Sequence, residues 1–238
     1  MTPLFLCDHA TNFIPPELND LGLPPSELAR HIAWDIGAAG VTKTLAEIFD
    51  APAVFSSVSR LVVDCNRHPE AADCVPTISD ATAIPGNSNL SGTERTARLE
   101  TWFHPYHQAV ESVLLERESR EVETVVISIH SMTESLAGEA RPWPIAISSY
   151  QDRSLADPIL AALRKSGEFP VGDNQPYDLD PAVDYSVPYH AMRRGLPHLQ
   201  VEFRQNEIAA AKAQQQWALV LAAALKECGI RASHSPGQ

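Results

Sequence analysis

The sequence has little positive charge, few cysteines and no long apolar run. Its 18 Lys and Arg residues face 30 Asp and Glu residues, which gives a formal net charge of −12 at pH 7. Nucleic acids and anionic membranes reward clusters of Lys and Arg, so this balance argues against both as partners. It does not exclude an anionic small molecule, because local arginines can bind a carboxylate within an overall acidic protein.

The four cysteines form no C-x-x-C pair, which predicts buried or loop thiols in a reducing cytoplasm. No apolar run approaches the roughly 18 residues of a membrane span. The first ten residues, MTPLFLCDHA, lack the basic region and the long apolar region of a signal peptide. We therefore expect a cytoplasmic protein without a membrane segment. The sequence does not indicate an oligomeric state.

The chain has 238 residues and is 44% hydrophobic, which suffices for one large α/β domain or at most two small ones. Apolar patterns predict strands at 3–7, 53–57, 61–64, 124–130, 144–149 and 198–203, and helices at 26–30, 34–49, 92–118, 153–166 and 206–228. This alternation predicts an α/β fold with a mixed, mainly parallel sheet and helices on its faces. We expect a single domain over 1–232 and a frayed tail at 233–238.

Several local signals refine this outline. Thr93 is a plausible N-cap of the helix at 92–118, and Pro105 inside it predicts a kink or a break. The segments 65–91 and 168–190 are long and rich in Pro and Asp. Long ordered loops in a compact domain are usually functional, so we expect these two segments to line a site.

Polar residues follow three of the predicted strands. VVISIHSM (125–132) is a β-branched run that leads into His130, PLFLCDH leads into Asp8 and His9, and HLQVEFRQ contains Glu202 and Arg204. Open α/β sheets bind ligands outside the carboxyl ends of their strands. Two histidines and a carboxylate in such positions suggest one polar site that holds a metal.

Each candidate also has a structural interpretation. His9 can bind a metal or a loop carbonyl, and Asp35 can cap the predicted helix at 34–49 or act as a metal ligand. Glu202 can be a general base, because an apolar surrounding raises the pKa of a carboxyl group, or it can pair with Arg204 or another arginine.

SRLVVDCNRHP (59–69) places Arg60 before an apolar run and Asn66 with Arg67 after it. A guanidinium and an amide in this arrangement favour binding of a substrate carboxylate, although surface arginines beside a turn are the alternative. A metal with two His and one carboxylate ligand activates water, a nearby Glu moves the proton, and an Arg anchors a carboxylate. This combination describes hydrolysis of the amide of an N-acyl amino acid.

The sequence resembles the N-formylglutamate amidohydrolase family. The resemblance runs in order from residue 6 to about 208 and rests on these segments: CDHATNFIP, HIAWDIGA, SRLVVDCNRHP, ISDATAIPGN, PYHQAV, ISIHSMT, ARPWPIAI, GDNQPY and RRGLPHLQVEFRQNEI. It implies a phosphorylase/hydrolase-like three-layer α/β/α fold, similar in design to zinc carboxypeptidases and aspartoacylases. It also implies metal-dependent hydrolysis of an N-acyl, in particular N-formyl, amino acid such as N-formylglutamate.

The resemblance also implies roles for individual residues. His9 and His130 would bind the metal, which is expected to be zinc, and Glu202 would be the general base. Arg60 would help to bind the substrate or stabilise the oxyanion. Asn66 and Arg67 would bind the substrate carboxylate, because DCNR resembles the DLNR segment of aspartoacylases. Arg141 and His190 are further candidates for contacts with the substrate.

One segment departs from the carboxypeptidase pattern. Those sites supply two ligands as H-x-x-E, whereas here His9 is followed three residues later by Asn12, and a neutral amide is a poor zinc ligand. Asp35 is the preferred third ligand and Asp8 the second candidate. Two other functions stay open: a hydrolase of aspartoacylase or carboxypeptidase type with another substrate, and a protein that binds acyl amino acids without turnover.

Overall fold

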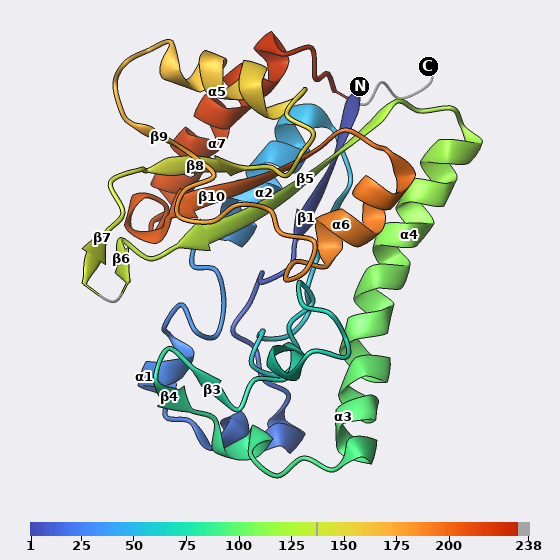
Figure 1. Ribbon diagram of the computed structural model, residues 1–238, viewed down its shortest axis with the longest axis vertical. Coiled ribbons are helices and arrows are strands. Elements are labelled where there is room, and N and C mark those ends of the chain that lie inside the picture. Colours follow the sequence, from blue (N-terminus) through green and yellow to red (C-terminus); the bar gives the residue numbers. More distant parts are fainter. Residues whose placement is uncertain (137, 233–238) are drawn as a thin grey trace.

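A six-stranded sheet forms the centre of the molecule (Figure 1). The computed structural model describes residues 1–136 and 138–232, so the predicted tail lies outside the described residues. The strand order is β2-β1-β5-β10-β8-β9. The strands are β1 (Thr2–Cys7), β2 (Ala53–Phe55), β5 (Thr124–Met132), β8 (Ile145–Ser148), β9 (Val171–Asp173) and β10 (His198–Arg204). Neighbouring strands are parallel except for the antiparallel pair β10 and β8. The predicted mixed, mainly parallel sheet is confirmed.

Helices cover both faces of this sheet. On one face lie α2 (Ala38–Phe49), α5 (Ala156–Arg164) and α7 (Ala211–Glu227), which share the largest hydrophobic cluster with the sheet. Of these, α7 packs against both α2 and α5. On the other face lie α4 (His104–Ser119) and α6 (Ser186–His190). Figure 1 shows the three layers, which confirm the predicted α/β/α sandwich.

The two-residue period of the strands assigns side chains to one layer or the other. Phe5 and Ile129 belong to the cluster with α2, α5 and α7, whereas Leu6 packs with α4 and α6. By the same period, His130 and Glu202 point to the side of α4 and α6. They are register partners on the adjacent strands β5 and β10, near the carboxyl ends of both. The sheet therefore brings these two polar residues together.

A second hydrophobic cluster lies beyond the carboxyl end of the sheet, in the lower part of Figure 1. It is surrounded by α1 (Pro25–Leu28), the hairpin β3 (Ile78–Ser79) and β4 (Thr82–Ala83), and α3 (Gly92–Arg98). Leu61, Val62 and Val63 belong to this cluster, and the strand predicted at 61–64 is wrong. The N–H of Val62 donates to the carbonyl of Ser59 at 2.9 Å, so this run is a buried turn. A short apolar run does not distinguish the two structures.

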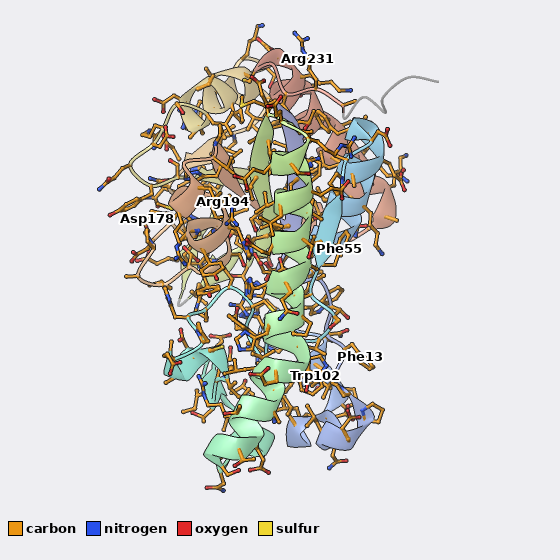
Figure 2. All side chains as sticks on the ribbon, turned by 90° about the vertical axis from the view of Figure 1, so that its right-hand side faces the viewer. Phe13, Phe55, Trp102, Asp178, Arg194 and Arg231 are labelled. Atoms are coloured by element: carbon orange, nitrogen blue, oxygen red, sulfur yellow. The ribbon has the colours of Figure 1, made fainter. Side chains whose placement is uncertain are left out.

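The predicted helix at 92–118 is continuous from α3 through a π-helical turn (Leu99–Phe103) into α4. Figure 2 shows it running along the molecule from the lower end, past Trp102, toward the sheet. Its N-cap is Ser91 and not Thr93, because Ser91 and Glu94 form a reciprocal capping box. Pro105 does not break the helix, since it follows the π-helical turn and occupies the first turn of α4.

Short elements escaped the sequence patterns, because they are too brief to show a period. They include β9, α6 and the hairpin β6 (Ser135–Leu136) and β7 (Glu139–Ala140). Short 3-10 helices occur at Pro16–Gly22, Ala72–Cys74, Pro85–Asn87, Met192–Arg194 and Gln205–Glu207. Within residues 1–136 and 138–232, no helix has the length and apolar character needed to cross a membrane.

Candidate active site

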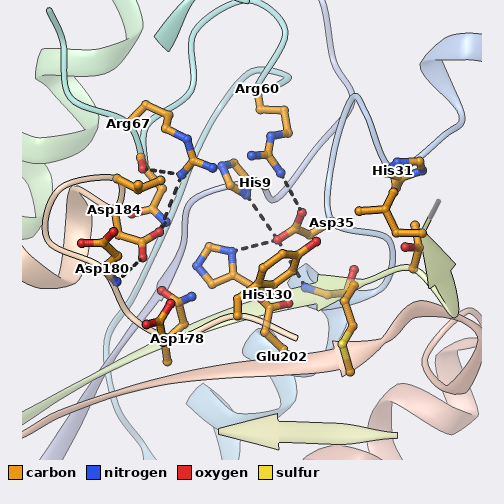
Figure 3. A pocket seen from close by; sticks show the side chains of 18 of the residues that line it. His9, His31, Asp35, Arg60, Arg67, His130, Asp178, Asp180, Asp184 and Glu202 are labelled. Carbon is orange, nitrogen blue, oxygen red and sulfur yellow. Dashed lines mark hydrogen bonds and ion pairs between the residues drawn. The ribbon is translucent and has the colours of Figure 1, made fainter. Parts of the chain in front are cut away.

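Three buried side chains meet at the carboxyl end of the sheet. Oδ2 of Asp35 lies 3.2 Å from Nδ1 of His9 and 2.9 Å from Nδ1 of His130. One ligand atom from each of the three residues lies within 4.8 Å of the others. Figure 3 shows the three side chains pointing toward one another. Two imidazoles and one carboxylate are a donor set that suits zinc and leaves a position open for water.

Asp35 reaches this position because α2 begins later than predicted, at Ala38. The side chain of Asp35 makes no capping hydrogen bond to the helix, so the capping interpretation of this residue is wrong. The carboxylate instead faces the two histidines and the guanidinium of Arg60, whose Nη1 lies 3.5 Å from Oδ1. Burial opposes ionisation of Asp35, but the nearby imidazoles outweigh it and hold its pKa below the usual range.

A carboxylate stands behind each of the two histidines. Nε2 of His9 lies 2.7 Å from Oδ1 of Asp64, and Nε2 of His130 lies 3.2 Å from Oδ2 of Asp8. Histidines that bind metals usually donate their second N–H to such a partner, which fixes the ring and raises its basicity. In this arrangement both Nδ1 atoms face Asp35.

Asp8 is fully occupied on the far side of His130. It accepts hydrogen bonds from Tyr106 at 2.6 Å, from Ser128 at 2.9 Å and from Ser186 at 2.5 Å. These bonds anchor the carboxylate behind the histidine and away from Asp35. The geometry therefore favours Asp35 over Asp8 as the third ligand.

Replacing Asp64 with asparagine is expected to lower the affinity for zinc by about 10–100-fold, the usual cost of losing such a partner. The carboxylate behind His9 is lost, while the size of the side chain is retained. Titration with zinc against a chromophoric chelator measures the effect. Asp73→Asn, which removes an exposed carboxylate beside Arg67, is the matched control. Equal zinc affinity in both variants would contradict the role of Asp64.

Glu202 lies beside this cluster, and its carboxyl group makes no hydrogen bond or ion pair within the described part of the chain. Burial raises the pKa of Glu202, the positive charge of His130 lowers it, and Asp35 raises it again, with a net increase. The alternative of a structural pair with Arg204 is wrong. Arg204 instead binds Glu207 and the carbonyl of Arg141. A buried carboxyl group with a raised pKa suits a general base.

Asn66 and Arg67 line the pocket, but most of their polar atoms bind protein groups. The Asn66 side chain donates to Asp184 at 2.9 Å and accepts from the N–H groups of Tyr185 and Ser186, each at 3.0 Å. Arg67 lies 3.1 Å from Asp73 and 3.6 Å from Asp184. Both residues therefore hold the loop before α6 against the site.

Arg141 lines the same pocket and is differently engaged. Its Nη1 donates to the hydroxyl of Thr133 at 3.0 Å and its Nη2 to the hydroxyl of Tyr177 at 2.6 Å. The guanidinium also lies over the Tyr177 ring, 4.9 Å from its centroid. No carboxylate among the described residues pairs with it, although its side chain is buried.

His190, predicted to bind substrate, lies outside the pocket. Its side chain is 0% exposed, between α4 and α6. Nε2 of His190 lies 2.9 Å from Nδ1 of His107, and Nε2 of His107 donates to the carbonyl of Cys65 at 3.0 Å. The sequence around His190 does not indicate this contact with His107, because α6 was not predicted.

This histidine pair is expected to make the protein less stable in acid. Burial and the neighbouring His190 lower the pKa of His107 to about 3. Burial lowers the pKa of His190 to about 4. The unfolded chain therefore binds more protons below its histidine pKa of about 6.5. The two neutral histidines make their full contribution to stability above pH 6.5, and the free energy of unfolding falls as the pH falls toward 4.

At pH 5 the loss is about 2 kcal/mol for one such histidine. Urea unfolding of wild type and His190→Gln between pH 5 and 7.5 measures it. Taking the difference removes the opposite contribution of His9 and His130, whose carboxylate neighbours raise their pKa against the effect of burial. His104→Gln, on the exposed side of α4, is the control. The same pH slope in wild type and His190→Gln would show that the pair does not titrate as described.

The pocket around these residues has a volume of about 510 Å³. It is lined by the three candidate ligands, by Glu202 and by the two long loops predicted to border a site. One loop contributes Asn66, Arg67 and Asp80, and the other contributes Tyr177, Asp178, Asp180, Val183 and Asp184. Asn12, the departure from H-x-x-E, is not part of this lining. Its side chain donates to the carbonyl of Leu28 at 2.9 Å. The residues missed from the sequence are Asp64, which stands inside the SRLVVDCNRHP motif, and Tyr177 and Asp184, which carry no signal of their own.

Comparison with known proteins places the chain in a family. The profile of the N-formylglutamate amidohydrolase family matches residues 2–209. A crystal structure of the gene product Atu2144 from Agrobacterium tumefaciens is 35% identical, with a TM-score of 0.89 over 95% of this chain and 91% of that chain.

A crystal structure of an N-formylglutamate amidohydrolase from Ralstonia eutropha JMP134 is 13% identical, with a TM-score of 0.61 over 93% of this chain and 92% of that one, and shows the same fold. No curated protein sequence matches significantly. The match over nearly the whole chain shows that this protein belongs to the N-formylglutamate amidohydrolase family.

Proposed function

We propose that this protein is a metal-dependent amidohydrolase that cleaves the amide bond of N-acyl, and first of all N-formyl, amino acids. The observation that carries the proposal is the buried cluster of His9, Asp35 and His130 with Glu202 beside it in one pocket. The family to which the chain belongs supports the same class of reaction on a small molecule. Free thiols at all four cysteines support the further proposal of a cytoplasmic location.

The donor set fits a divalent cation, for which zinc is the expected choice. Asp8, Asp35 and Asp64 surround the two imidazoles in a buried space, so the site carries an excess of negative charge for a cation to compensate. Nδ1 of His9, Nδ1 of His130 and Oδ2 of Asp35 would hold it. Bound there, the cation would lower the pKa of a water molecule and polarise the amide carbonyl of the substrate.

The protein side chains would carry the remaining roles. Glu202 takes a proton from the attacking water and delivers it to the amide nitrogen as the C–N bond breaks, so that the products are an amine and a carboxylic acid. Arg60 lies near Asp35 at the pocket wall, where it stabilises the oxyanion that develops on the carbonyl oxygen. Arg141 is the first candidate for binding the substrate carboxylate, because Arg67 already lies between Asp73 and Asp184.

The test is release of formate or amine from a panel of N-formyl and N-acetyl amino acids, with zinc, manganese or cobalt added in turn. We expect turnover of N-formyl amino acids that is lost with a chelator and restored by the metal. A folded protein that turns over no member of the panel would contradict the proposal. Activity confined to acyl-aspartate or to peptides would instead assign the aspartoacylase or carboxypeptidase type of reaction.

A further inference from the structure

The charges that line the pocket restrict the substrate. The lining contains three guanidinium groups and six carboxyl groups, which belong to Asp35, Asp80, Asp178, Asp180, Asp184 and Glu202. Asp80 is paired with Arg30, whereas Asp178 and Asp180 form no ion pair with a described residue. A substrate with two carboxylates, such as an acyl glutamate, would bring a second anionic group into a pocket with these two carboxyl groups, and a substrate with one carboxylate would not.

Two of the three arginines are already neutralised by protein carboxylates. Arg60 binds Asp64 through two nitrogens, at 2.8 and 3.0 Å. Arg67 lies between Asp73 and Asp184. The Arg141 guanidinium donates to the neutral hydroxyl groups of Thr133 and Tyr177. It is the one pocket guanidinium without a carboxylate partner among the described residues, and it retains N–H donors for a ligand. The pocket therefore offers one position for a substrate carboxylate.

The wall near Arg67 is unsuited to a second carboxylate. Figure 3 shows Asp178, Asp180 and Asp184 together on the side of the pocket where Arg67 lies. Asp184 already contacts Arg67, and Asp180 accepts a hydrogen bond from the N–H of Ala182. An anionic side chain of a substrate that entered this region would meet like charge.

Apolar side chains also line the same pocket. They are Tyr177, Leu136 and Val183, and their exposed fractions are 43%, 38% and 44%. Tyr177 stacks on Arg141, so its ring adjoins the proposed carboxylate position. Large apolar side chains that stay exposed inside a pocket gain free energy when a ligand covers them.

We propose that the preferred substrates carry a single carboxylate and an uncharged, apolar side chain. The carboxylate binds Arg141, and the side chain covers Tyr177, Leu136 and Val183. This inference rests on the proposed amidohydrolase function and narrows its substrate class to N-acyl derivatives of neutral, apolar amino acids.

The test compares kcat/KM for N-formylleucine, N-formylglutamine and N-formylglutamate. Glutamine and glutamate have the same shape, so this pair isolates the charge. We expect N-formylglutamine to exceed N-formylglutamate by about tenfold, the effect of one like charge at pocket distances. We expect N-formylleucine to exceed N-formylglutamine. Equal or better use of N-formylglutamate would overturn the inference on charge, and N-formylleucine no better than N-formylglutamine would overturn the apolar contact.

Two variants probe the residues directly. Asp178→Asn is expected to raise kcat/KM for N-formylglutamate several-fold and leave the ratio of N-formylleucine to N-formylglutamine unchanged. Leu136→Ala is expected to lower kcat/KM for N-formylleucine about tenfold and change N-formylglutamine less. The opposite pattern in either variant would overturn the assignment of that wall.

Failure of the inference can be separated from failure of the proposed function. Turnover with N-formylglutamate preferred contradicts only the inference, whereas no turnover of any N-formyl amino acid contradicts the function. Calorimetric binding of N-formylleucine and N-formylglutamate to Glu202→Gln protein with zinc measures the preference without chemistry. Tighter binding of N-formylglutamate there would overturn the inference in either case.

Discussion

Replacing Glu202 with glutamine is expected to lower kcat by about 10²–10⁴-fold, the contribution of a well-placed general base. Glutamine keeps the shape of the side chain in its buried place on β10, but an amide accepts no proton at neutral pH. In the proposed binding mode the substrate would still meet Arg141 and the pocket wall, so KM should change little. Steady-state kinetics on an N-formyl amino acid with zinc present measures both constants.

A suitable control for this variant is Glu207→Gln. Glu207 follows the same strand and pairs with Arg204, but it does not line the pocket. We expect near wild-type kcat for this control and one zinc per chain in both variants by elemental analysis. Undiminished kcat in Glu202→Gln would remove Glu202 from the mechanism. Loss of zinc from Glu202→Gln would instead indicate that Glu202 takes part in metal binding.

The sheet could be predicted because its central strands are buried on both faces. β1, β5 and β10 read as dense apolar runs, and their ends fell within one or two residues of the observed ones. Leu61–Val63 has the same composition but no partner strand, and the second hydrophobic cluster buries it as a turn. Local sequence patterns indicate which residues are buried, but they do not indicate which backbone groups form hydrogen bonds with each other.

The candidate site divides in a similar way. His9, His130 and Glu202 could be found because each stands at a strand end, and strand ends meet at one edge of the sheet. The positions of Asp64 and Asp8 behind His9 and His130 could not be predicted, because they depend on side-chain directions that only the folded chain fixes. His190 was misplaced because its neighbour His107 is distant in sequence and lies on another helix.

Replacing Asp35 with asparagine is expected to remove stoichiometric zinc binding and, with it, measurable turnover. Asp35 is the one carboxylate that faces Nδ1 of both His9 and His130, and a neutral amide is a poor zinc ligand. Loss of a carboxylate behind a ligand costs about 10–100-fold in affinity, so loss of a ligand should cost more than about 100-fold. Zinc content after dialysis and kcat with added zinc measure the two effects.

Thermal unfolding gives a readout of Asp35 that does not depend on activity. A metal that binds only the folded chain stabilises it by about 4 kcal/mol at a concentration 1,000 times its Kd, so zinc should raise the Tm of the wild type. Asp35→Asn should show no such rise, while Asp80→Asn, a pocket carboxylate that pairs with Arg30, should keep it. A Tm rise retained in Asp35→Asn and lost in Asp8→Asn would transfer the third ligand to Asp8. A rise retained in both would contradict a site built on His9, His130 and either carboxylate.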